Sequence, residues 1–248
     1  YHVTGGEPTW AGQNLATVER QINLWGLRAF RREAQHEVKG AVGALWDQQW
    51  INRNRVSEVP TIIKIKTAID PMGSTKARHA ETGIVTGGKD DRHPPHLYVF
   101  EDASLSATPP EWASAAIGSN KKFKGGGLVG ETNFGAQMVE YTLRAIEPSV
   151  AFNEVHASRG KTARAEPVAT ATHQGRVHFV GHFPELEEEL TTWVQGQGPS
   201  PNRLDALVWL AHDLGIVSDV GGEAATADPV TRSAHATRPR SSWDVTRR

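Results

Sequence analysis

The sequence predicts an α/β fold built on a mixed sheet, in which an antiparallel meander is extended by parallel strands and flanked by helices. Between residues 61 and 102, three β-rich stretches follow one another with short connections, which is the pattern of a meander. From residue 127 onward, β-rich and amphipathic stretches alternate. That alternation is typical of parallel strands whose connecting helices cover the sheet.

The first strand of the meander is predicted at residues 61–69, which are mostly β-branched and apolar, as in a central strand. Residues 82–86 and 96–102 are the second and third strands, and the glycine- and proline-containing stretch 87–95 is the turn between them. A helix begins at Pro110, with proline and glutamate in its first turn, where both are favoured.

The alternating half of the chain contains three predicted strand–helix pairs. The strands are expected at 127–131, 150–156 and 176–181, and the helices that follow them at 134–146, 160–173 and 184–194. A last helix is expected within residues 199–214, because proline presets its first turn and the apolar residues recur at helical spacing. The apolar face of this helix comprises Leu204, Leu207, Val208, Ala211 and Leu214.

Length and composition divide the 248 residues into three parts. We expect a globular domain at 46–217, preceded by a helical segment, 1–45, that forms the end of a further domain and its linker. Residues 218–248 have few aliphatic side chains and a basic end, which predicts a disordered tail. Because the chain begins with Tyr1, we expect a fragment of a longer polypeptide.

Composition also restricts the classes of function. The chain has no cysteine, which excludes disulfides and thiolate metal sites. Its net charge of −1 creates no global attraction to nucleic acid, so that DNA binding requires a local basic patch. No run of about 18 apolar residues is present, and the sequence therefore predicts no membrane span.

Three acidic residues are placed where a sheet and a helix can present them together. Asp70 ends the first strand, Glu131 ends the strand at 127–131, and Asp205 lies in the first turn of the last helix. Side chains at the carboxyl ends of strands emerge at one rim of a sheet, so Asp70 and Glu131 converge if their strands are neighbours. The alternatives are that Asp70 only opens a turn and that Asp205 only stabilises a helix N-terminus.

A cluster of three carboxylates requires cations. At an effective dielectric constant of about 20, two like charges 4 Å apart repel by about 4 kcal/mol. Oxygen-only ligands favour Mg²⁺ or Mn²⁺, and two such ions about 3.5–4 Å apart are the arrangement of phosphodiester hydrolysis. The acids at 70, 131 and 205 therefore predict a nuclease with two metal ions.

A basic group follows the strand at 150–156. Arg159, Lys161 and Arg164 lie at the start of the next helix, an arrangement suited to a DNA phosphate. The alternative is a solvated helix start without a ligand.

Four stretches of the sequence resemble one protein family. Residues 131–140, 156–168, 175–190 and 200–209 resemble, in this order, segments of the C-terminal nuclease domain of tailed-bacteriophage terminase large subunits, and the match extends over about 46–214. The resemblance implies a ribonuclease H-like fold that cuts concatemeric double-stranded viral DNA, with low sequence specificity, when packaging begins and ends. It also implies that Asp70, Glu131 and Asp205 are the catalytic metal ligands and that Lys161 lies near them or near the DNA.

The family also suggests partners. They are double-stranded DNA, the terminase small subunit and the portal protein, in the cytoplasm of the host cell and transiently at the procapsid. The phosphate-binding loop of the family's ATPase is missing from this chain, so translocation is not expected of it alone. Two alternatives stay open: a resolvase-like or integrase-like nuclease of the same fold, and a non-catalytic module that docks the packaging motor to DNA or to the portal.

Overall fold

The structure is a computed structural model that describes residue 17 and residues 41–71, 81–131, 136–157, 160–197 and 201–217. The expected tail at 218–248 and nearly all of the expected lead-in at 1–45 lie outside these residues. All described elements belong to one compact unit of the chain. None of the helices in the described part has the length and apolar character needed to cross a membrane.

The antiparallel meander predicted from the sequence is present. It consists of β2 (Ile62–Pro71), β3 (Glu81–Asp90) and β4 (Leu97–Asp102), with β3 paired to both of its neighbours. The two-residue strand β5 (Leu105–Ser106) pairs with the beginning of β3. β3 therefore occupies the middle of the meander.

Parallel strands extend the meander on both sides, as the alternating pattern predicted. On one side β6 (Leu128–Glu131) pairs with β2, and β7 (Phe152–Val155) pairs with β6. On the other side β8 (Val177–Val180) pairs with β4, and β1 (Arg55–Val56) pairs with β8. The sheet order is β1-β8-β4-β3-β2-β6-β7.

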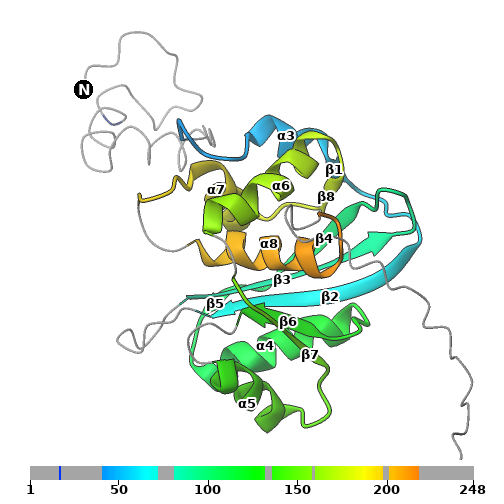
Figure 1. Cartoon of the computed structure of the whole chain (residues 1–248), viewed down its shortest axis with the longest axis vertical. Helices are drawn as coiled ribbons and strands as arrows, with labels where there is room; N and C mark the ends of the chain where they lie inside the picture. The colour runs from blue at the N-terminus through cyan, green and yellow to red at the C-terminus, as the bar shows by residue number, and fades with distance from the viewer. Residues whose placement is uncertain are drawn as a thin grey trace, which may run out of the picture. The chain divides into compact units, whose positions relative to one another are not determined.

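Helices cover both faces of the sheet (Figure 1). One face carries α4 (Pro109–Lys122) and α5 (Ala136–Ile146), which enclose the smaller apolar core. The other face carries the larger core. Its helices are α3 (Gln48–Arg53), α6 (Lys161–His173), α7 (Pro184–Thr192) and α8 (Asn202–Asp213).

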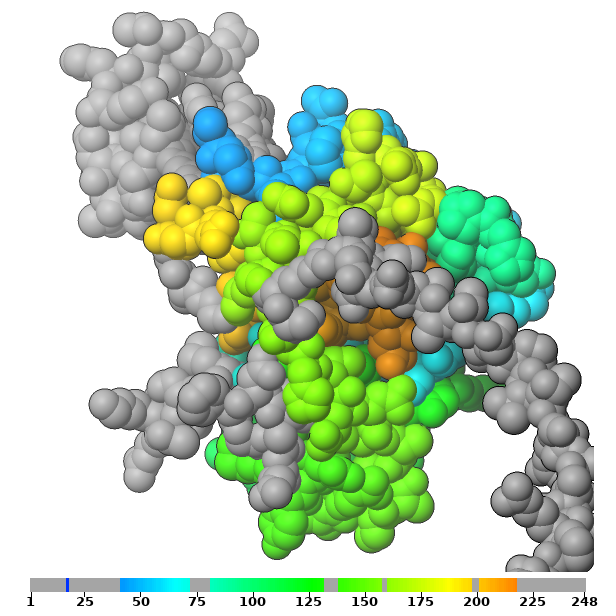
Figure 2. Space-filling model, in the orientation of Figure 1, coloured from blue at the N-terminus to red at the C-terminus, as the bar shows by residue number. Residues whose placement is uncertain are grey.

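Helix α8 is the central element of the larger core. It packs on β2 and β3, and α6 and α7 lie on its other side (Figure 1). Its residues from Leu204 to Ala211 are all buried. In the space-filling view, orange atoms of the α8 region are visible near the middle of the molecule (Figure 2). The apolar face predicted for this helix is confirmed, although burial extends well beyond that face.

Two glycines on β3 explain how a helix lies so close to the sheet. A Cβ at Gly87 would lie 3.1 Å from Cδ2 of Leu210, and one at Gly83 would lie 2.0 Å from the Asn202 carbonyl oxygen. Side chains at these two positions would hold α8 away from β3 along most of its length. The close contact between helix and sheet therefore depends on their absence.

The structure differs from the expected elements in three places. β3 continues to Asp90, through the glycines at 87–88 that were predicted to form a turn, because these glycines admit neighbouring atoms of the sheet and of α8. α4 continues to Lys122 and includes part of the expected linker. The strands β1 and β5, of two residues each, were not predicted, since such short strands carry no recognisable pattern.

Candidate active site

Asp70 and Glu131 lie at neighbouring strand ends. In the parallel pair of β2 and β6, Ile69 is in register with Gly130, and the next residue on each strand is an acid. Ala68 and Val129, two residues before these acids, belong to the core on the α8 side. Because side chains alternate along a strand, both carboxylates emerge on the face that carries α8.

The first turn of α8 brings the third acid to the same place. Asp70 is paired across the ladder with Gly83, and Gly83 is the residue on which Asn202 packs. Asp205 lies one turn further along α8 and is 2% exposed. The sequence-predicted acids at 70, 131 and 205 are therefore brought together at one rim of the sheet.

Asp205 interacts with two cations supplied by α6. Lys161 Nζ donates a hydrogen bond to Asp205 Oδ2, and Arg164 Nη2 lies 3.7 Å from Oδ1. Among the described residues, the Asp205 carboxylate accepts no hydrogen bond from a backbone N–H, so capping of its own helix does not explain it. The side chain is instead directed at the acidic cluster.

Arg164 connects two of the acids. Its Nη1 lies 3.5 Å from Glu131 Oε2, which also accepts a hydrogen bond of 3.1 Å from Trp209 Nε1. The guanidinium group stacks on the Trp209 ring at 4.3 Å. With only 6% of its side chain exposed, Arg164 is a buried cation held between an aromatic face and two carboxylates.

The described part of the cluster has more negative than positive charges. Three carboxylates face two cationic groups, and Asp70 has no hydrogen bond or ion pair with any described residue. Burial raises the pKa of Asp70 well above its usual value, and Asp205 and Glu131 raise it further. Burial also raises the pKa of Asp205, against the opposing effects of Lys161 and Arg164.

Among the described residues, the ion pairs of the site leave Asp70 without a counter-charge in contact, and the acids offer the donor type that a divalent cation prefers. In the present side-chain arrangement, no group of three or more His, Asp or Glu within the described residues is set to hold an ion, and Lys161 and Arg164 contact the carboxylate oxygens instead. The donors are nevertheless all carboxylate oxygens, as Mg²⁺ and Mn²⁺ prefer. A cation would oppose both the burial and the repulsion from Asp205 and Glu131 that raise the pKa of Asp70.

The residues of the predicted basic group occupy different environments. Lys161 lies at the site, with 38% of its side chain exposed, which agrees with its expected proximity to the acids. Direct contact of Arg164 with a DNA backbone does not fit its placement, because that side chain is buried and faces Glu131 and Asp205. Arg159 lies outside the described residues.

Two residues of the site were missed by reasoning from the sequence. Trp209 reads as one more apolar position of α8, and only the structure reveals its hydrogen bond to Glu131. Gly83 reads as an ordinary strand glycine, and its role follows from a contact with Asn202 that is distant in sequence. Neither contact leaves a local signal in the sequence.

The sequence matches no protein-family model, and comparison with curated proteins finds no match. Solved structures do match. The nuclease domain of the large terminase subunit gp2 of bacterial virus Sf6 is similar, with a TM-score of 0.51 and 15% identity over 68% of this chain and 98% of that domain. A mutant of that domain has been determined with calcium.

Two longer large terminases are also similar. One, from a thermophilic bacteriophage, has a TM-score of 0.51 and 15% identity, and that from bacteriophage HK97 has 0.53 and 12%. The match covers 80% and 79% of this chain, but only 52% and 48% of theirs, so the chain corresponds to about half of each. The chain therefore has the mixed-sheet, ribonuclease H-like fold of terminase nuclease domains, as the sequence resemblance implied.

Proposed function

We propose that this chain is a metal-dependent endonuclease that cuts double-stranded DNA during the packaging of a phage genome. The observation that carries the proposal is the convergence of Asp70, Glu131 and Asp205 at one rim of the sheet, where the described side chains carry more negative than positive charge. The fold shared with terminase nuclease domains supports the same reading.

In this proposal Asp70, Glu131 and Asp205 hold two Mg²⁺ or Mn²⁺ ions. When bound, such ions activate a water molecule and neutralise charge on a scissile phosphate. Similar nuclease domains have been determined with calcium and with manganese, which supports a divalent ion without identifying it. The chain's own part is to direct the three carboxylates at one point.

Lys161 and Arg164 have different roles in the proposal. The half-exposed Lys161 would give up its ion pair with Asp205 if that carboxylate held an ion, and its ammonium group would then be available to a DNA phosphate. Arg164 stays buried against Trp209 and keeps Glu131 and Asp205 oriented. In this proposal Lys161 thus changes its partner, whereas Arg164 keeps the same contacts throughout.

The proposal extends to partners by analogy with the longer proteins. The similar chains from HK97 and from the thermophilic bacteriophage are large terminases about twice as long as the matched part. We therefore propose that this chain works beside an ATPase motor, with double-stranded DNA as substrate and the terminase small subunit and the portal as partners. Its cuts would start and end packaging, with low sequence specificity.

The proposal is tested by cleavage of supercoiled plasmid DNA with Mn²⁺, with Mg²⁺ and with chelator. Asp70→Asn, Glu131→Gln and Asp205→Asn should each lower the rate by about 100-fold or more, because each removes a charged ligand of the ions. Asp213→Asn is the matched control, since Asp213 lies half-buried at the other end of the same helix, where Oδ1 accepts a 2.9 Å hydrogen bond from Asn153. It should cut as the wild type does.

Three other results would contradict the proposal. Cleavage that persists in the acid variants would refute the site. Preference for branched over linear duplex DNA would favour a resolvase-like enzyme. Tight DNA binding without metal-dependent cleavage under any of these conditions would favour a docking module.

A further inference from the structure

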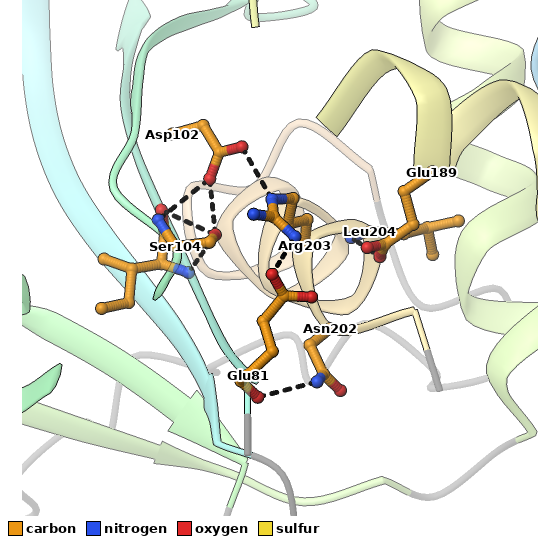
Figure 3. A network of polar contacts seen from close by, with 8 residues as sticks. Glu81, Asp102, Ser104, Glu189, Asn202, Arg203 and Leu204 are labelled. Carbon is orange, nitrogen blue, oxygen red and sulfur yellow. Dashed lines mark hydrogen bonds and ion pairs between the residues drawn. The ribbon is translucent and has the colours of Figure 1, made fainter. Parts of the chain in front are cut away.

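A polar network joins the first turn of α8 to the sheet beside the candidate active site (Figure 3). At its centre Arg203 donates hydrogen bonds to two acids on different strands. Nε bonds Asp102 Oδ2 of β4 at 3.0 Å, and Nη1 bonds Glu81 Oε1 of β3. Because 13% of the Arg203 side chain and 8% of the Asp102 side chain are exposed, this ion pair is shielded from solvent.

Neighbouring contacts hold the same turn. Asn202 Nδ2 donates a 2.8 Å hydrogen bond to the Glu81 carbonyl oxygen, and the Leu204 N–H donates one of 2.8 Å to Glu189 Oε1 of α7. Asp102 also accepts a 3.1 Å hydrogen bond from the Ser104 N–H. The first turn of α8 is thus bound to β3, β4 and α7 together (Figure 3).

The position of this network links it to the acids. Glu81 is two residues before Gly83, which is paired with Asp70 across the ladder. Arg203 is two residues before Asp205, so their side chains project about 200° apart around α8. Anchoring Arg203 on the side of β3 and β4 therefore fixes the rotation of the helix, and with it the direction of Asp205 toward the opposite side.

We propose that Arg203 is a positioning residue: through Glu81 and Asp102 it sets the rotation and depth of the first turn of α8, and so directs Asp205 at Asp70 and Glu131. The role toward a metal rests on the proposed function. Within the described residues, the ion pairs of Arg203 are with Glu81 and Asp102 and not with the three acids. Arg203 therefore acts on Asp205 through the backbone of α8.

The test compares Arg203→Met with Arg55→Met in the full chain. Arg55 is the matched control, because it forms a similarly buried pair with Glu187, at 2.8 Å, between β1 and α7. Calorimetric titration with Mn²⁺ should show about tenfold weaker binding or more for Arg203→Met, the effect expected when a residue behind metal ligands is lost. Arg203→Lys keeps the positive charge but loses the guanidinium group that donates to both acids. Its affinity for Mn²⁺ should therefore lie between those of the wild type and Arg203→Met.

Amide hydrogen exchange gives a readout that needs no metal. In Arg203→Met the Asp205 N–H, which donates to the Pro201 carbonyl oxygen, should exchange about tenfold faster or more relative to the Leu214 N–H at the other end of α8, because a released first turn opens more often. Arg55→Met should leave that ratio unchanged.

The outcomes separate the two proposals. If the wild type fails to bind Mn²⁺, the proposed nuclease is refuted, and the positioning of α8 is judged by exchange alone. If Arg203→Met binds Mn²⁺ as the wild type does, or if Arg55→Met weakens binding equally, the positioning role is overturned. An unchanged exchange ratio in Arg203→Met overturns it as well.

Discussion

Gly83 of β3 lies so close to Asn202 of α8 that a Cβ on Gly83 would stand 2.0 Å from the Asn202 carbonyl oxygen. The same glycine is paired with Asp70 across the ladder. One contact thus sets how closely the helix that carries Asp205 approaches β3, at the residue paired with the first acid. The geometry of the candidate site depends on it.

Gly83→Ala should therefore destabilise the fold, by about 3 kcal/mol, because the obstructing atoms belong to backbone and α8 must move away. Urea unfolding measures the loss. Gly118→Ala is the control, since Gly118 lies exposed in α4 and a Cβ there meets nothing within 4 Å. It should gain about 0.5–1 kcal/mol from helix propensity. Equal stability of the Gly83 variant and the wild type would contradict this close packing.

Arg164→Leu should cost about 3–5 kcal/mol without metal, because it leaves Glu131 and Asp205 without their buried counter-charge. Saturating Mn²⁺ should raise the melting temperature of this variant more than that of the wild type, since the ion then replaces the missing positive charge. Thermal unfolding with and without Mn²⁺ measures both effects. If Mn²⁺ raised the melting temperature of Arg164→Leu by no more than that of the wild type, Arg164 and the metal ion would not be neutralising the same carboxylates.

Lys161→Met should tighten Mn²⁺ binding several-fold, because the Lys161 ammonium group competes for Asp205. The same variant should cut DNA more slowly, since the proposal places this ammonium group at the phosphate. Lys122→Met, which removes an exposed ion pair between Lys122 of α4 and Glu101 of β4, should change neither quantity. Weaker Mn²⁺ binding in Lys161→Met would refute the competition and make Lys161 a supporting residue of the site.

Glu189→Gln should change the pH dependence of stability. Burial raises the pKa of Glu189 to about 7, with opposing contributions from the Leu204 N–H and Arg203 and smaller increases from Glu81 and Asp205. Because this folded-state pKa lies above the ordinary value of 4.5, the wild type loses stability as the pH rises from about 4.5 through 7. Glutamine keeps the acceptor for the Leu204 N–H and carries no charge.

The stability of Glu189→Gln relative to the wild type should therefore rise over that interval, by on the order of 3 kcal/mol, and level off above it. Urea unfolding at several pH values between about 4.5 and 8.5 measures the difference. A constant difference across this range would mean that Glu189 titrates normally in the folded protein.

The main outline of the fold could be predicted from local patterns. The β-branched run before Asp70 and the alternation after residue 127 specify strand types, and right-handed parallel connections leave few arrangements. The extension of β3 through Gly87 could not be predicted, because glycine there serves contacts with Leu210 and Tyr98 that are distant in sequence.

The acids of the candidate site were likewise predictable, because strand ends and a helix start can be recognised from the sequence alone. For the two cations, only their position at the start of α6 could be predicted, and not their exposure or their contacts. Lys161 and Arg164 are three residues apart on α6, yet one side chain is half exposed and the other buried against Trp209. That difference arises from how α6 packs on α8, which no local pattern encodes. The sequence alone therefore did not distinguish the placements of Lys161 and Arg164, on which the two proposed roles depend.

Direct titration with Mn²⁺ tests whether Asp70, Glu131 and Asp205 together form a metal site. The wild type should bind two ions, Asp70→Asn, Glu131→Gln and Asp205→Asn should each lose at least one of them, and Asp213→Asn should bind both. Wild-type binding in the three acid variants, or an equal loss in Asp213→Asn, would contradict it.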